Sequence, residues 1–314
     1  MSTSFDQFLD KAYKGQPLSD ILEASPAALR GVTDSDADKL DEAFGIRTIR
    51  QMAENKFFGV AQAILAASGE PRYDNAPSRS WDAFFADAPL QYYEQHPAGR
   101  FRLQFGPVYY RGRLDGSARV LIIGQDPATN EILAHRVFVG NSGQRIQGLL
   151  DRMGITRSYI FVNTYLYSVF GQFDAELRNI SLEDPIRSYR HELLDKIMAE
   201  NEIEAIWAMG NGAQHAADNW PGAGNTPRYD FTHPAALNHQ ALFANWNTGI
   251  DQMQNIITPD EDGNATFTHY GPAWQDGDLI PIPRYDLPFG IPDWHGIGSR
   301  SQRDGNNRIV WIAP

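Results

Sequence analysis

The chain of 314 residues contains no cysteine. This absence excludes disulfide bonds, zinc–thiolate centres, iron–sulfur clusters and a cysteine nucleophile. Long apolar runs are also missing, because stretches such as residues 120–123 are far shorter than the roughly 20 residues that a membrane-spanning helix needs. No basic segment followed by an apolar one opens the sequence, so we expect no signal peptide. These absences predict a soluble, cytoplasmic protein without a membrane partner.

Positive charge is scarce as well. The chain has 27 basic and 39 acidic residues, and its formal net charge is −12. Taken over the whole chain, this charge argues against a nucleic-acid partner. Its distribution weakens the argument, because 13 of the 14 basic residues between positions 96 and 258 are arginines, the side chain best suited to bidentate phosphate contacts. Ordinary surface charge would give the same count, so both interpretations stay open at this stage.

The hydrophobic content of 42% is typical of a globular protein, and its patterning changes along the chain. Residues 1–95 have helical patterns and form a predicted N-terminal helical extension. Residues 96–258 alternate strand and helix patterns and form a predicted α/β catalytic domain. Residues 259–314 are rich in proline, glycine and aspartate and are predicted to be a C-terminal extension packed on that domain.

The continuous apolar run at residues 120–123 indicates a strand that is buried on both faces. Three further strands are predicted at residues 159–162, 203–209 and 229–232. Strands that alternate with helices need crossover connections, and these give a parallel sheet. The predicted fold is therefore α/β: a three-layer α/β/α domain with a central, mainly parallel four-stranded sheet, plus an N-terminal helical lobe.

Two helix N-termini are predicted beside this sheet. Ser142 is expected to cap one helix, and Pro234 is expected to open another that extends to about residue 257. Helix N-termini present free amide groups that bind phosphate. Both positions are therefore candidate phosphate contacts.

Each predicted strand is succeeded by a short polar segment. Gln125 and Asp126 come after the first strand, Asn163 ends the second, and His233 follows the fourth. Ligands of open parallel sheets bind beyond the carboxyl ends of the strands. An acid, an amide and an imidazole are thus expected to converge on one edge. Single residues of these types are common as turn residues or satisfied surface groups, so a chance arrangement stays an alternative.

The motifs at this edge resemble those of the uracil-DNA glycosylase superfamily. Residues 124–127, Gly-Gln-Asp-Pro, are similar to its first motif, and residues 233–237, His-Pro-Ala-Ala-Leu, are similar to its second. Residues 137–143 resemble the phenylalanine segment of the iron–sulfur branch, and residues 159–163 resemble the strand that ends in the uracil-reading asparagine. The resemblance covers about residues 118–245.

The first motif looks like a hybrid of two branches of that superfamily. Ala128 and Thr129 stand where the Gly-Gln-Asp-Pro branch has Tyr-His, and Glu131 matches a glutamate of the iron–sulfur branch. The four cysteines of that second branch are absent. These departures bear on substrate choice more than on the chemistry.

The resemblance implies a DNA-repair enzyme that needs no cofactor and no metal. No lysine is placed to form a Schiff base, so we expect a monofunctional enzyme without lyase activity. It would flip uracil out of single- or double-stranded DNA and hydrolyse the N-glycosidic bond, leaving an abasic site and free uracil. Asp126 would stabilise the sugar cation and orient or deprotonate the attacking water, and His233 would donate a hydrogen bond, or carry charge, toward uracil O2. Phe138 would stack on the flipped base, and Asn163 would read its edge.

Further contacts follow from the same resemblance. The backbone at Gln125 would touch O2 or a phosphate, and Leu237 would act as the wedge that fills the vacated stack, with helix packing as its alternative. Glu131 is the candidate that excludes the methyl group of thymine; its alternatives are capping a turn or pairing with Arg136. The other expected DNA contacts are Ser142, Arg145 and Pro234.

Other functions remain open from the sequence. The protein could be a superfamily member that excises another deaminated base, or a non-catalytic module that binds nucleotides or damaged DNA in the same pocket. An unrelated flavodoxin-like protein is a further alternative, although no glycine-rich dinucleotide fingerprint or P-loop supports it. We expect a monomer.

Overall fold

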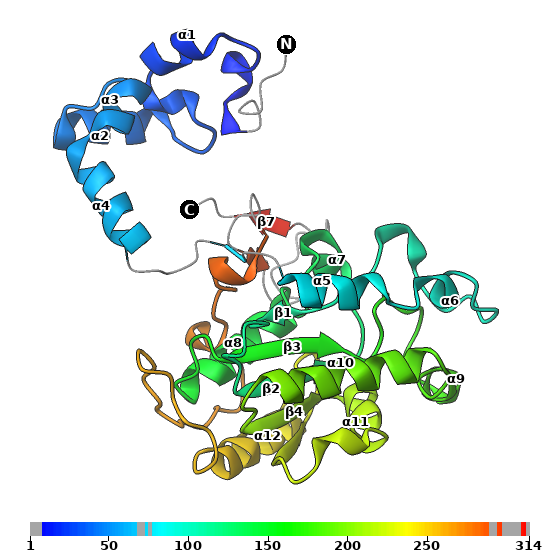
Figure 1. Ribbon diagram of the computed structural model, residues 1–314. Helices are drawn as coiled ribbons and strands as arrows, with labels where there is room; N and C mark the ends of the chain where they lie inside the picture. The colour runs from blue at the N-terminus through cyan, green and yellow to red at the C-terminus, as the bar shows by residue number, and fades with distance from the viewer. Residues whose placement is uncertain (1–7, 68–72, 75–76, 289–293, 297–308, 312–314) are drawn as a thin grey trace. The chain divides into compact units, whose positions relative to one another are not determined.

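The computed structural model describes residues 8–67, 73–74, 77–288, 294–296 and 309–311. The chain divides into two compact units, and the boundary between them falls at residues 71 and 72. Figure 1 shows both units in one ribbon diagram. Each unit is considered by itself below.

The first unit is helical. Its α-helices are α1 (Leu18–Glu23), α2 (Asp34–Phe44), α3 (Ile49–Glu54) and α4 (Lys56–Ala67). Thr33 caps α2 and Thr48 caps α3, and in both cases the side chain at the third helical position binds the amide of the capping residue in return. Gly45 ends α2 in the left-handed conformation, with φ of 67°. The predicted helical lobe is therefore present, and Gly45 separates α2 from α3.

The second unit is built on a five-stranded sheet in the order β1-β3-β2-β4-β5. Its strands are β1 (Arg111–Gly112), β2 (Val120–Gly124), β3 (Tyr159–Asn163), β4 (Ala205–Met209) and β5 (Arg228–Phe231). The four strands from β2 to β5 are parallel, as predicted, and β1 adds a short antiparallel edge on β3. Every residue of β2, β3 and β4 is buried, which explains their continuous apolar sequences.

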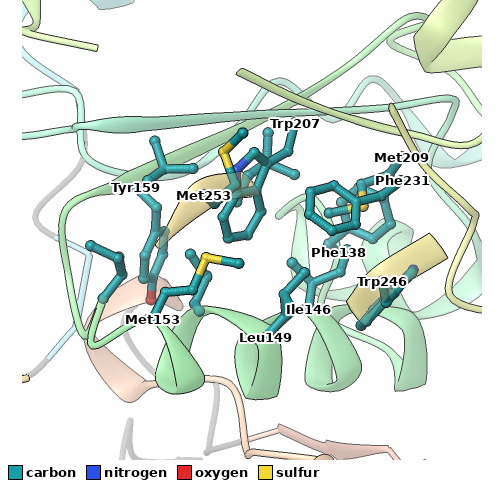
Figure 2. Close-up of a cluster of buried hydrophobic side chains, with 14 of the residues drawn as sticks. Phe138, Ile146, Leu149, Met153, Tyr159, Trp207, Met209, Phe231, Trp246 and Met253 are labelled. Atoms are coloured by element: carbon teal, nitrogen blue, oxygen red, sulfur yellow. The ribbon is translucent and has the colours of Figure 1, made fainter. Parts of the chain in front are cut away.

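Helices cover both faces of this sheet, so the three-layer α/β fold is confirmed (Figure 1). Side chains of α8 (Asn141–Arg152) and α12 (His239–Met253) share one core with Trp207 and Phe231 (Figure 2). Side chains of α10 (Ile186–Glu200) and α11 (Asn211–Asp218) share a second core with Leu121 and Ile123. The short helices α7 (Thr129–Ala134) and α9 (Ala175–Ile180) follow the carboxyl ends of β2 and β3.

Residues 77–95, which the sequence pattern places in the predicted N-terminal extension, pack in the second unit. They form α5 (Arg79–Ala86) and α6 (Leu90–Glu94). Trp81 and Phe85 belong to the same core as Leu121, and Tyr93 packs with Tyr165 in a third core. The aromatic residues of this segment are thus anchors of the α/β unit.

Both predicted helix starts were wrong. Helix α8 begins at Asn141, because the carbonyl of Gly140 already accepts from the Gln144 amide at 3.0 Å, so Ser142 is its second residue and not its cap. Helix α12 begins only at His239. The Asn238 side chain caps it by accepting from the Ala241 amide at 3.1 Å, and Pro234 lies in a turn before it.

The described part of the C-terminal segment packs on the sheet through a buried carboxylate. Asp286 accepts from Arg111 Nη1 at 2.7 Å and from the Tyr159 hydroxyl at 2.9 Å, and it also pairs with Arg113. Beyond it, β6 (Trp294–Gly296) pairs antiparallel with β7 (Ile309–Trp311) in a separate two-stranded sheet.

Candidate active site

The ends of β2 and β3 bring the first two polar segments together. Gly124 and Asn163 are direct neighbours in the parallel register. The pairing continues past both strands, because the Thr164 amide and hydroxyl both donate to the Gly124 carbonyl at 2.9 Å, and the Tyr165 amide donates to the Gln125 carbonyl at 2.9 Å. This extended pairing fixes Asp126 and Asn163 on adjacent, hydrogen-bonded loops.

Asp126 is a partly buried carboxylate with two fixed partners. Its Oδ2 accepts from the Val169 amide and its Oδ1 accepts from Gln125 Nε2, both at 2.9 Å. Burial raises the pKa of Asp126 to about 6, although both hydrogen bonds act in the opposite direction, and the negative charge of Glu131 adds to the rise. A carboxyl that titrates near the working pH is suited to act as a general base.

His233 is held in one tautomer by the backbone that follows it. The Ala235 amide donates to its Nδ1 at 3.1 Å. An amide can only donate, so Nδ1 is an acceptor and the ring proton of the neutral imidazole sits on Nε2. Burial, together with the positive charge of Arg145, lowers the pKa of His233 to about 4. His233 is therefore a neutral hydrogen-bond donor at neutral pH.

These two pKa shifts predict the pH dependence of catalysis. We expect kcat/KM to rise with pH through about 6, as Asp126 becomes ionised, and to reach a plateau. His233 should add no limb above pH 5, because it is already neutral there. A pH–rate profile between pH 4.5 and 9 checks this, with Asp126→Asn as the control that should lose the acid limb. A fall in rate on deprotonation of a group near pH 6.5 would show that a charged imidazole is required.

Gly124 allows two predicted site residues to meet. A Cβ atom built on Gly124 would lie 2.3 Å from Asn163 Oδ1 and 2.6 Å from Phe138 Cε2. Both side chains therefore occupy the space that a Cβ atom at position 124 would need, so only glycine fits there. Asn163 itself is 4% exposed, and its Nδ2 is buried without a hydrogen-bond partner among the described residues. A buried, unpaired donor is costly unless a ligand satisfies it.

Phe138 stands in a constrained backbone. Its φ is 52°, a left-handed conformation that side-chain-bearing residues rarely adopt. Gly143 lets helix α8 approach closely, because a Cβ there would lie 1.6 Å from the Phe138 carbonyl oxygen. The ring belongs to the core over α8 (Figure 2) and its centroid lies 6.5 Å from that of His233. Phe138 thus packs in the core and also borders the site.

Glu131 organises the loop that carries Phe138. Its Oε1 accepts from the amides of Val139 at 2.9 Å and Gly140 at 3.0 Å, and its Oε2 accepts from the amide of Ala128 at 3.2 Å. The side chain is buried, and its three hydrogen bonds to backbone amides show the turn-capping alternative. The Arg136 alternative is not seen among the described residues, where Arg136 pairs with Asp74 at 2.8 Å. Exclusion of thymine by Glu131 stays a prediction.

The three hydrogen bonds that Glu131 accepts from backbone amides determine what its substitution should do to stability and activity. Glu131→Ala should lower the free energy of unfolding by about 3 kcal/mol, because it leaves buried amides unsatisfied. It should also slow excision, since the Phe138 backbone loses its support. Glu131→Gln retains one acceptor oxygen and should lose less in both. Urea unfolding and single-turnover assays measure the two effects. Thymine excision by Glu131→Ala, with a stable fold and undiminished uracil excision, would instead support the methyl-gate role.

The residues predicted to contact DNA differ in their exposure and in the contacts they already make within the protein. Leu237 is 74% exposed, so it has no packing role in the described structure. Arg145 Nη1 donates to the Pro234 carbonyl at 2.6 Å and its guanidinium lies 4.4 Å from the Trp274 ring centroid. Arg145 therefore supports the turn after His233. Ser142 lies in the first turn of α8, whose leading amides have no partner within the helix.

Several contributions to the site have no motif of their own in the sequence. The Val169 amide binds Asp126. A Cβ on Gly210 would lie 2.8 Å from His233 Cβ, and one on Gly212 would lie 2.6 Å from Gln125 Cγ. The glycines after β4 are thus what permits the loops of His233 and Gln125 to approach. The only sequence feature that could have indicated this role is that Gly210 and Gly212 directly follow a predicted strand.

The described residues offer no obvious place for a metal ion. Among them, no group of three or more His, Cys, Asp or Glu side chains is placed to hold one. In the same part of the chain, no helix has the length and apolar character needed to cross a bilayer.

A comparison with protein families identifies the domain that carries this site. Residues 112–249 match the family model described as the uracil DNA glycosylase superfamily, so the chain contains a domain of this superfamily. No curated protein matches the chain. A domain of this superfamily implies a DNA glycosylase, a hydrolase of DNA repair that acts on damaged bases.

Proposed function

We propose that the protein is a monofunctional uracil-DNA glycosylase. The observation that carries the proposal is the buried Nδ2 of Asn163, which has no hydrogen-bond partner among the described residues, while Oδ1 of the same side chain lies against Gly124 beside Phe138. Uracil O4 is an acceptor and N3–H is a donor, so one asparagine amide satisfies both: Nδ2 donates to O4 and Oδ1 accepts from N3–H. Phe138 stacks on the base so held.

The mechanism uses the two groups whose pKa values are shifted in opposite directions, upward for Asp126 and downward for His233. As the N-glycosidic bond breaks, the sugar develops positive charge and the base leaves as an anion. Ionised Asp126 stabilises the sugar cation and takes a proton from the water that adds to C1′. Neutral His233 donates from Nε2 to uracil O2, where negative charge accumulates. Asp126 then releases its proton to solvent and the uracil anion takes one up, so the products are an abasic site and free uracil, and no covalent enzyme intermediate forms.

Contacts with the DNA strand complete the proposal. Exposed Leu237 fills the stack left by the flipped base. The first turn of α8 at Ser142 and the backbone of Gln125 bind phosphate or base oxygens. The hybrid of two superfamily branches, the monomeric state and the cytoplasmic location stay predictions.

The experiment is incubation with single-stranded DNA that carries one uracil, followed by alkali. Strand cleavage only after alkali supports a monofunctional glycosylase. Parallel substrates with hypoxanthine, xanthine and thymine test the base. Excision of one of these without uracil would indicate another substrate, and binding without an abasic product would indicate a non-catalytic module.

A further inference from the structure

A short antiparallel ladder is attached directly to Asp126. The Arg102 amide donates to the Ser168 carbonyl and the Phe170 amide donates to the Arg100 carbonyl, both at 2.8 Å. Between them, Phe101 and Val169 form a β-bridge, and it is the Val169 amide that binds Asp126 Oδ2. The backbone of this ladder is therefore fixed relative to the candidate catalytic carboxylate.

Arg102 differs from its neighbour Arg100 on this ladder. Arg100 is neutralised by ion pairs with Asp174 and Glu176. Arg102 has no carboxylate partner among the described residues, and its guanidinium lies 4.1 Å from the Phe170 ring centroid. Its charge reaches the site, because it acts on Asp126 to lower the pKa of that carboxyl against the larger effect of burial.

Phe170 is an aromatic ring displayed at the surface. It is 41% exposed and belongs to none of the hydrophobic cores. One face of the ring meets Arg102, and its exposed surface has no packing function in the described structure. An exposed aromatic beside an unpaired arginine is a combination that binds single strands, through base stacking and phosphate contact.

We propose that Arg102 and Phe170 form a binding surface for the DNA strand beside the excised nucleotide. Arg102 contacts a backbone phosphate, and Phe170 stacks on an adjoining base. In a chain with a net charge of −12, an unpaired cation next to the active site is a specific phosphate contact and not part of a general basic surface. The inference rests on the proposed function only for the identity of the excised base.

Binding of a fluorescein-labelled single strand without uracil tests the surface. Anisotropy titrations over a range of salt concentrations, at pH 8, give the affinity and its salt dependence. Arg102→Ala should weaken binding about tenfold and reduce the slope of log affinity against log salt by about 0.7, the value for one phosphate on a single strand. Phe170→Ala should weaken binding roughly 5- to 100-fold and leave the slope unchanged.

Control variants separate these effects from folding and general charge. Arg79 is exposed without an ion-pair partner among the described residues, and its neighbour Ser80 bonds to Lys196 near the C-terminal end of α10, away from the site edge. Arg79→Ala should therefore bind like the wild type. Phe170→Tyr should retain stacking and Phe170→Leu should lose it. Thermal unfolding confirms that each variant is folded.

The outcomes distinguish this surface from the proposed function. If both alanine variants bind DNA as the wild type does, while the wild type excises uracil, the surface is refuted and the function stands. If the wild type releases no uracil but the two variants lose affinity and slope as described, the surface stands and the base assignment fails. If Arg79→Ala and Arg102→Ala lose equal DNA affinity, the effect is due only to the change in net charge, and the proposal is overturned.

Discussion

Asp126→Asn should lower the single-turnover rate of uracil excision by about 10²–10⁴-fold, the usual effect of removing a general base or an electrostatic stabiliser. The amide cannot take a proton from water and carries no charge to oppose the sugar cation. Its Oδ1 can still accept from the Val169 amide, and its Nδ2 can donate to Gln125 once that side chain turns its own amide over. The local structure should therefore survive.

The same variant should be at least as stable as the wild type. The folded-state pKa of Asp126 is about 6 against an ordinary 3.8, so ionisation is less favourable in the folded protein than in the unfolded chain. The stabilising contribution of this group is full below pH 3.8 and is lost as pH rises through about 6. Removing the charge should raise the free energy of unfolding at pH 8 by up to about 3 kcal/mol.

Urea unfolding at pH 8 and quenched-flow excision assays check the two effects together. Asp151→Asn is the matched control, because Asp151 is an exposed carboxylate near the end of α8. It should change neither quantity. An Asp126→Asn protein with near-normal turnover would remove Asp126 from the mechanism. A strongly destabilised one would show that its hydrogen bonds outweigh its desolvation.

The sheet and the convergence of the site were predictable from the sequence for a physical reason. Buried parallel strands need continuous apolar residues, and their carboxyl ends must share one edge, so the residues after each strand are brought together by topology alone. Asp126 and Asn163 follow neighbouring strands and lie on hydrogen-bonded loops. His233 and Phe138 approach the same edge, with ring centroids 6.5 Å apart.

Helix starts were less predictable, because several residues compete to begin a helix. Pro234 has a suitable φ, but the Ala235 amide is bound by His233 Nδ1, which leaves Asn238 to cap α12. This side-chain contact gives the Ala235 amide a hydrogen-bond partner outside the helix, and it competes with a helix that would start at Pro234. No propensity scale contains that contact, since it depends on how the imidazole is placed.

Contacts made to backbone amides leave no sequence signal either. The role of Glu131 depends on the amides of Val139 and Gly140, eight and nine residues further along the chain. Arg102 reaches the site through pairing with residues more than sixty positions away. Any residue type supplies a backbone amide, so the partners of such contacts carry no characteristic pattern.

Asn163→Asp should reverse the preference for the base. Cytosine presents an acceptor at N3 and a donor at N4, the opposite of uracil. A carboxylate accepts from N4–H, and in its protonated form it also donates to N3. With uracil, the ionised group would face the O4 acceptor without a donor. We therefore expect uracil excision at pH 8, where the introduced carboxyl is mainly ionised, to fall by about 10²–10³-fold, and weak cytosine excision to become detectable at lower pH.

The burial of position 163 gives this substitution a characteristic pH dependence. The native side chain is 4% exposed, so burial should raise the pKa of the introduced carboxyl and keep part of it protonated near neutral pH. Cytosine excision needs that protonated form together with ionised Asp126, whose pKa is about 6. The rate on cytosine should therefore pass through a maximum near pH 6 and decline on both sides, unlike the plateau expected for uracil in the wild type.

Single-turnover assays on matched oligonucleotides with uracil or cytosine measure both activities. Asn163→Ala is the control: it removes the amide without supplying an acid, so it should lose uracil excision and gain none on cytosine. Unchanged uracil excision in Asn163→Asp would mean that another amide reads the base. Loss of uracil excision without any activity on cytosine, in a folded variant that still binds DNA, would leave Asn163 in the pocket but contradict the hydrogen-bond pattern assigned to it.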